Sequence, residues 1–299
     1  MIQKPIYLLF ALAASLPLPF LHNLGSLFGL AGFYLGKKTR ARITKNVHSS
    51  KLAQSNQAEQ NLIKAVCRES MKSGLELPIA WTRSTEYIVS LFKQTHGLEH
   101  LQAALNNKQG ILLITPHLGS YDLAGRFLSE QLPFPLTAMY RPPKLRWLEN
   151  VMNAGRVRDN GRTAPATLQG VKQIVRALKQ GEATIILPDQ FPKEGDGVWV
   201  HFLNQPAYTM TLAAKLANLP NVSTLFFCGE RLPHGQGFAL HIAPLSGSLT
   251  GDKKQDTQLI NNNAEHWIAR FPEQYLFGYN RFKGNPPADM REQTMPPKH

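Results

Sequence analysis

The sequence predicts an α/β fold: a central mixed, largely parallel sheet flanked by helices, preceded by an N-terminal membrane anchor helix. Three observations favour this prediction. From position 97 onward, short apolar runs alternate with amphipathic stretches, which is typical of alternating strands and helices. Residues 5–36 contain no Asp, Glu, Lys or Arg. No segment recurs with a period of about 20 to 50 residues, so we do not expect a repeat protein.

Residues 1–36 form the predicted anchor. The uncharged stretch is longer than the ~20 apolar residues that a helix needs to cross a bilayer, but Pro17 and Pro19 interrupt it near its middle. It forms either one kinked membrane-spanning helix, which we expect, or two short helices that dip into one leaflet. A cleaved signal peptide is the competing interpretation. The apolar character that continues to Leu35 argues against cleavage.

A basic cluster follows the anchor and predicts its orientation. Five Lys or Arg residues lie between positions 37 and 45, whereas only Lys4 precedes the uncharged stretch. The positive-inside bias therefore places the rest of the chain on the cytoplasmic side, and the cluster would bind anionic lipid headgroups. We expect a basic juxtamembrane region over 37–96, helical from 40 to 94, and an α/β domain over 97–299.

Apolar runs predict the strands of the α/β domain, and the amphipathic stretches between them predict its helices. Strands are expected at 111–115, 136–140, 183–187, 222–227 and 238–242, and helices at 166–179, 209–218 and 255–270. Gly181 is a plausible stop for the first of these helices. In sheets of this class, ligands bind where strands end and loops begin.

The charge of the chain indicates its partners. Lys and Arg number 33 and Asp and Glu 20, a formal net charge of +13, which favours anionic partners such as acidic lipids, phosphorylated substrates or an acidic carrier protein. The basic residues are scattered without an aromatic-interleaved motif, so we expect no nucleic-acid binding.

The cysteines and histidines do not predict a metal site. Cys67 and Cys228 match neither a disulfide framework nor a zinc spacing, and we expect buried thiols in a reducing compartment. The histidines lack two-ligand helical spacing, and there is no Gly-rich phosphate loop. No metal or other cofactor is expected.

The turn after the 111–115 strand carries the candidate catalytic residues. His117 leaves the strand, and Asp122 follows in the first turn of the next helix. A carboxylate that orients an exposed imidazole suits general-base catalysis. The same spacing also fits a helix N-terminus with a well-placed Asp and a solvated His. Ser120 lacks the Gly-x-Ser-x-Gly elbow of a nucleophilic serine, so we expect no covalent intermediate.

Further blocks follow the His-x4-Asp motif in a fixed order. They are MYRP at 139–142, LPDQ at 187–190, VHF at 200–202 leading to PAYT at 206–209, FPEQYLF at 271–277 and RFK at 281–283. Together they resemble the bacterial lipid A biosynthesis late acyltransferases of the lauroyl/myristoyl type, within the glycerolipid acyltransferase superfamily. One departure is Tyr279-Asn280, where that family usually carries His or a second Arg.

The resemblance implies a bacterial inner-membrane enzyme. It would transfer a fatty acyl chain from acyl carrier protein to a hydroxyl of a phosphorylated lipid A precursor, with His117 as the base and Asp122 as the group that fixes its tautomer. The expected substrate-binding residues are Arg141, Arg156, Arg158, Asp189, Gln190, Arg281 and Lys283. The arginines suit phosphate groups, Asp189 and Gln190 would position the acceptor, and Arg281 and Lys283 would contact phosphate or support the fold.

Two alternatives remain open. The acceptor could be another lipid, such as a lysophospholipid or a glycolipid, because the His-x4-Asp chemistry is common to these acyltransferases. The chain could also be a non-catalytic, basic membrane-binding protein, in which case replacing His117 would leave its activity unchanged.

Overall fold

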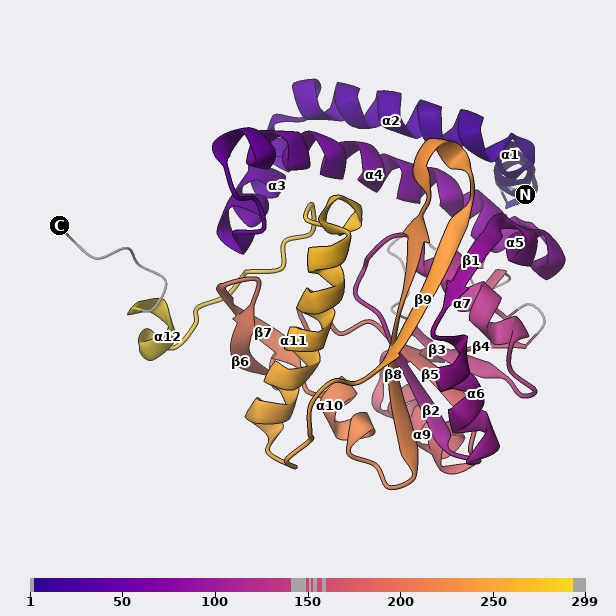
Figure 1. Ribbon diagram of the computed structural model, residues 1–299, viewed down its shortest axis with the longest axis vertical. Coiled ribbons are helices and arrows are strands. Elements are labelled where there is room, and N and C mark those ends of the chain that lie inside the picture. The colour runs from indigo at the N-terminus through magenta and orange to yellow at the C-terminus, as the bar shows by residue number, and fades with distance from the viewer. Residues whose placement is uncertain (1–2, 141–148, 151, 153–154, 158–159, 293–299) are drawn as a thin grey trace.

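A computed structural model describes residues 3–140, 149–150, 152, 155–157 and 160–292 (Figure 1). Its centre is a seven-stranded sheet in the order β1-β9-β8-β2-β5-β3-β4. All neighbours in this sheet are parallel except β8 and β9, which confirms the mixed, largely parallel sheet. The strands are β1 (Phe92–His96), β2 (Gly110–Ile114), β3 (Leu136–Tyr140), β4 (Gly161–Pro165), β5 (Ala183–Ile186), β8 (Val222–Arg231) and β9 (Phe238–Pro244).

Strand β2 shows why helices cover both faces of the sheet. All five of its residues are buried, and successive side chains point to opposite faces. Ile111 and Leu113 pack with α6 (Leu98–Asn106) and α7 (Tyr121–Glu130). Leu112 and Ile114 belong to the core on the other face, which is covered by α9 (Leu168–Lys179), α10 (Leu212–Ala217) and α11 (Lys253–Arg270). Burying each such side chain contributes about 1.5–3 kcal/mol.

Four strands and several helix ends were not predicted. The stretch 40–94 contains α3 (Lys37–Ser50), α4 (Asn56–Thr82), α5 (Thr85–Leu91) and the start of β1. Because β1 is an exposed edge strand with mostly polar side chains, no apolar run marks it. β4 was also missed, as was the separate antiparallel hairpin of β6 (Gly197–Phe202) and β7 (Gln205–Met210).

The predicted anchor consists of two helices. α1 (Gln3–Ser15) and α2 (Leu18–Leu35) meet at a bend of 110°. Proline lacks the N–H of a helix interior and is tolerated in a first turn, and Pro17 and Pro19 accordingly stand at the start of α2. Within the described residues no single helix is long and apolar enough to cross a membrane, although this bent pair passes that test together. The structure therefore has two helices where one kinked anchor helix was expected.

Helix α2 packs closely along α4 (Figure 1). A Cβ atom added to Gly29 would lie 2.4 Å from the carbonyl oxygen of Cys67, and one added to Gly25 would lie 2.9 Å from the backbone of Lys72. Small residues four apart on one helix face allow two backbones to approach in this way. The tip of the β8–β9 hairpin, at Gly235, also contacts Pro19 of α2.

A buried ion pair and a histidine hydrogen bond join α2, α4 and β8. His22 Nε2 lies 2.7 Å from Glu76 Oε1, and Arg231 donates from Nη2 to Glu76 Oε2 at 2.9 Å. All three residues are less than 5% exposed. Burial alone would raise the pKa of Glu76, but the contacts with Arg231 and, to a lesser extent, His22 together outweigh it and hold that pKa at about 2. The N-terminal helices are therefore fixed to the sheet by ionic contacts as well as by apolar packing.

The close approach of α2 and α4 predicts opposite effects for two glycines on α2. Gly29→Ala should lower the free energy of unfolding by about 1–3 kcal/mol, because the new Cβ meets the α4 backbone. Gly32→Ala is the matched control: nothing lies within 4 Å of its added Cβ, so the better helix propensity of Ala should raise stability by up to ~1 kcal/mol. Urea unfolding in mild detergent measures both. Equal effects at the two positions would contradict this packing.

Candidate active site

The turn that carries His117 lies between β2 and α7 and is held by backbone hydrogen bonds. The Gly119 N–H donates to the Gln274 carbonyl at 3.0 Å, the Ser120 N–H donates to the Gly229 carbonyl at 2.8 Å, and the Leu276 N–H donates to the His117 carbonyl at 3.1 Å. Gly119 has φ +59°, and a Cβ there would lie 2.1 Å from the Gly229 oxygen. A glycine is therefore required for the turn to reach β8.

The imidazole of His117 pairs with Asp189. His117 Nδ1 lies 2.7 Å from Asp189 Oδ1, and the His117 backbone N–H donates to Asp189 Oδ2 at 3.0 Å. Asp189 follows β5, the parallel neighbour of β2, so both residues emerge at the same edge of the sheet. Because the carboxylate accepts from Nδ1, the lone pair of the imidazole is on Nε2.

Asp189 remains ionised although it is buried. Burial opposes its ionisation, but the adjacent His117, two hydrogen bonds from His117 and the charge of Arg281 lower the pKa of Asp189 below its ordinary value. On the opposite ring nitrogen, the Gln190 amide nitrogen lies 3.0 Å from His117 Nε2. An imidazole with a carboxylate on Nδ1 and its lone pair on Nε2 can accept a proton from a hydroxyl that takes the place of this amide.

Asp122 has a different partner from the one expected. Its Oδ1 accepts from Arg156 Nη2 at 2.7 Å and from Arg156 Nε at 3.2 Å. Asp189, instead of Asp122, lies beside the imidazole. Burial disfavours the charge of Arg156, but Asp122 reverses this and raises the pKa of Arg156. The reason is geometric: Asp122 lies on the first turn of α7, whereas Asp189 leaves the strand paired with β2. The structure thus corrects the partner, although Asp122 and His117 line one cavity.

The other expected substrate-binding residues fall into four groups. Gln190 and Arg156 line the same cavity as His117. Arg281 is 2% exposed, donates to the Tyr208 carbonyl at 2.7 Å and also bonds Thr209 Oγ1, so it supports the fold around Asp189. Lys283 is exposed, with its Nζ 4.6 Å from the centroid of the Phe191 ring. Arg141 and Arg158 lie outside the described residues.

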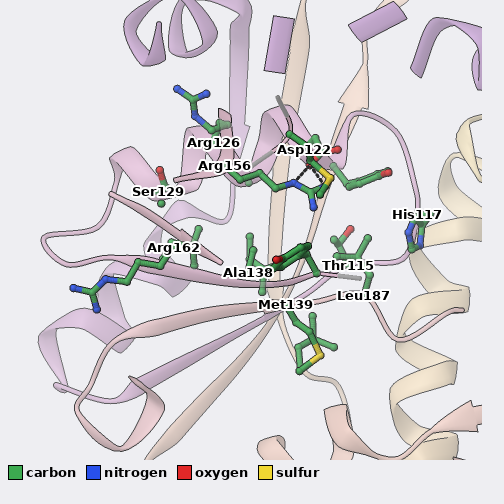
Figure 2. Close-up of a pocket in the computed structure, with 18 of the residues that line it drawn as sticks. Thr115, His117, Asp122, Arg126, Ser129, Ala138, Met139, Arg156, Arg162 and Leu187 are labelled. Atoms are coloured by element: carbon green, nitrogen blue, oxygen red, sulfur yellow. Dashed lines mark hydrogen bonds and ion pairs between the residues drawn. The ribbon is translucent and has the colours of Figure 1, made fainter. Parts of the chain in front are cut away.

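A cavity of about 300 Å³, here called the sheet cavity, extends from His117 between α7 and strands β3 and β5. Figure 2 shows His117 at one end of it and Ser129 and Arg162 towards the other. Most of the wall is apolar or small, as in Gly125, Ala138, Met139, Ile185 and Leu187. A cavity with a base at its mouth and an apolar wall suits a long hydrocarbon chain whose reactive end lies at the base.

Sequence reasoning missed this wall and the pairing of Asp189 with the imidazole. The pairing could have been inferred from two polar residues that follow two apolar strands by similar distances. The wall has no comparable signal, because its residues come from α7, β3 and β5 and look like ordinary core residues.

The described residues contain no group of three or more His, Cys, Asp or Glu that could hold a metal ion. Cys67 and Cys228 are free and buried, as predicted, and burial raises the pKa of both thiols.

Comparison with known proteins gives consistent matches over the chain. The family model described as bacterial lipid A biosynthesis acyltransferase matches residues 6–284. The chain is 28% identical over 272 residues to the lipid A biosynthesis palmitoleoyltransferase of Escherichia coli (strain K12), covering 91% of this chain and 87% of that protein. It is 29% identical over 283 residues to the lipid A biosynthesis lauroyltransferase of the same strain, covering 92% and 89%.

The ionised state of Asp189 predicts a pH-dependent effect on stability. Asp189→Asn should lower the free energy of unfolding by about 2 kcal/mol at neutral pH, because a charged hydrogen bond to His117 is lost. Since the folded protein lowers this pKa from its ordinary 3.8, the stabilisation is present above that value and is lost as the pH falls through the folded-state pKa.

Urea unfolding of wild type and variant from neutral to acidic pH measures this effect, and the two free energies should converge in acid. Glu194→Gln is the control, because Glu194 is exposed and its replacement should change little at any pH. A difference between Asp189→Asn and wild type that stayed constant into acid would contradict the ionised pair.

Proposed function

The chain belongs to the bacterial lipid A biosynthesis acyltransferase family, and from this premise we propose that it transfers a fatty acyl chain from acyl carrier protein to a hydroxyl of a lipid A precursor, as a late acylation step. The observation that carries the proposal is the His117–Asp189 pair at the end of an apolar cavity. The E. coli relatives named above are palmitoleoyl and lauroyl transferases, so enzymes of this family differ in the acyl chain that they transfer.

We propose that His117 acts as a general base. Its Nε2 accepts the proton of the acceptor hydroxyl while the oxygen attacks the thioester carbonyl of the donor. Asp189 stabilises the imidazolium that forms. When the tetrahedral intermediate collapses, the C–S bond breaks, the imidazolium returns the proton to the leaving thiolate, and the new ester is released. No acyl-enzyme is formed on this route.

We assign Asp122 and Arg156 to the developing negative charge. The carboxylate of Asp122 holds the Arg156 guanidinium in the same cavity as His117, where a cation can stabilise the oxyanion of the intermediate. Arg141, Arg158 and Lys283 remain candidates for contacts with the phosphorylated acceptor. The acyl chain would occupy the sheet cavity. The surplus of 13 basic residues suits both an acidic carrier and a phosphorylated lipid.

We propose that α1 and α2 lie in one leaflet of the inner membrane, with the catalytic domain on the cytoplasmic side. Of the 13 large apolar side chains that are exposed among the described residues, ten lie in residues 7–35, which forms a concentrated apolar surface. The opposite side of α2 is buried through Leu21, Gly25 and Gly29. The basic helix α3 that follows would bind anionic headgroups beside this surface.

The catalytic assignment predicts the following kinetics for acyl transfer to a lipid A precursor. His117→Ala should lower kcat by about 100- to 10,000-fold, because it removes the base. Asp189→Asn should cause a larger loss than Asp122→Asn, because only Asp189 contacts the imidazole. Mass spectrometry of the product over time, with purified protein and acyl carrier protein thioester, measures these rates.

Thermal melts of the same samples provide the control for folding. Wild-type rates in His117→Ala would refute the base assignment, and a larger loss in Asp122→Asn would assign the orienting role to Asp122 instead. Transfer to lysophospholipid but not to the lipid A precursor would replace the proposed acceptor.

The membrane assignment predicts a matched pair of surface variants. Leu9→Glu combined with Phe28→Glu should strongly reduce co-sedimentation with phosphatidylglycerol vesicles, because both side chains are exposed on the proposed membrane face. Leu168→Glu, on α9 and 73% exposed, should bind like wild type. Unchanged binding of the double variant would refute this face. An N-terminal tag should be digestible from the same side as the catalytic domain, whereas a spanning helix would place it on the opposite side.

A further inference from the structure

A second cavity reaches the same imidazole. It has a volume of about 200 Å³ and lies between α4, the His117 turn and η2 (Pro272–Gln274); we call it the α4 cavity. His117, Tyr121 and Asp122 line both this cavity and the sheet cavity. Two separate spaces therefore converge on one base, as a transfer between two bound substrates requires.

We propose that the α4 cavity binds the uncharged, hydroxyl-bearing part of the lipid acceptor, while the acyl chain of the donor occupies the sheet cavity. This inference rests on the proposed function. It adds the site of the second substrate and the chemical character of the group that enters it.

The walls of the α4 cavity are mostly apolar, with a few hydrogen-bonding groups and no free charge. No Lys or Arg lines it among the described residues. Its two carboxylates are already paired, Glu76 with Arg231 and Asp122 with Arg156. A phosphate group would find no cation there to compensate its desolvation, whereas neutral hydroxyl groups need only hydrogen-bonding partners.

Such partners are present. The hydroxyls of Ser70 and Ser120 line the cavity and make no hydrogen bond to the described part of the chain. The amide of Gln274 is fixed, because its Oε1 accepts from the Arg231 N–H at 2.8 Å and its Nε2 donates to the Arg231 carbonyl at 3.1 Å. The cavity thus combines a rigid wall with two available hydroxyls next to the base.

The position of the cavity favours the lipid acceptor over the soluble carrier. Arg68 and Lys72 of α4 contact α2. Two residues further along the helix is a rotation of about 200°, so Ser70 and Gly74 lie on the opposite side of α4, where they line the cavity. One helix, about 10–12 Å across, therefore separates α2 from the cavity. An acceptor anchored in the membrane beside α2 would have to extend its reacting hydroxyl past this one helix.

Gly74 provides a way to close this cavity. It belongs to α4 and lines the cavity. Nothing in the described protein lies within 4 Å of a Cβ atom added to Gly74. The Cβ of a leucine there would meet no backbone atom, and the rest of its side chain would occupy space that the acceptor needs. Ala138 is the corresponding position in the sheet cavity, and Gln60 is an exposed position on α4 outside both cavities.

The test compares Gly74→Leu, Ala138→Leu and Gln60→Leu in the full-length protein, with lipid A precursor as acceptor and acyl carrier protein thioesters of several chain lengths as donors. Gly74→Leu should raise KM for the acceptor at least tenfold and leave KM for the donor unchanged. Ala138→Leu should instead shift the preference towards shorter acyl chains. Gln60→Leu should match wild type, and thermal melts verify that all three variants fold.

Binding without turnover separates this inference from the proposed function. In a His117→Ala background, adding Gly74→Leu should weaken binding of the lipid A precursor about tenfold, as measured by the shift in melting temperature over a range of lipid concentrations. If Gly74→Leu raises KM for the donor instead, the cavity belongs to the carrier arm and the inference is overturned. Unchanged acceptor binding would overturn it as well. Absence of transfer by the wild-type protein would refute the proposed function, and the binding comparison would still decide which substrate the cavity holds.

Discussion

The parallel pairing of β2 with β5 is the constraint on which the candidate site depends. Ile114 and Ile186 are partners in the register, and His117 and Asp189 each follow their strand partner by three residues. Two chains that run in the same direction and leave the sheet together therefore bring an imidazole and a carboxylate into contact. Both strands are buried on both faces, and a slip of one residue would break this close packing, so burial of the core also fixes the geometry of this pair.

Buried charge links this pair to the N-terminal helices. The side chain of Arg231 pairs with Glu76 of α4, and Glu76 also contacts His22 of α2. The backbone N–H and carbonyl of Arg231 both bond the side-chain amide of Gln274. The backbone carbonyl of Gln274 in turn accepts from the Gly119 N–H in the His117 turn. Removing one member of such a buried pair typically costs about 3–5 kcal/mol. The apolar N-terminus is therefore part of the framework that holds the turn, and it also presents an exposed apolar surface.

The sequence predicted the sheet better than the regions around it. Strands β2, β3, β5, β8 and β9 were expected close to their observed bounds, since each is a compact apolar run. Strand β1 was missed because its side chains are polar and exposed. Pro17 and Pro19 marked the break between α1 and α2, but no local pattern encodes the 110° angle at which the two helices meet. His117 was placed correctly at a strand end. Its partner was not, because the nearest carboxylate in sequence lies on a helix that turns it towards Arg156.

The sequence by itself determined the α/β class, the strand that leads to His117, the basic surplus and the ordered blocks that indicate the family. These follow from local composition and spacing, which the chain carries wherever it folds. Only the tertiary structure decided that Asp189 holds the imidazole, that Asp122 holds Arg156, and that two cavities meet at His117. Each of these joins residues from elements distant in sequence, and their contacts depend on strand order and helix packing.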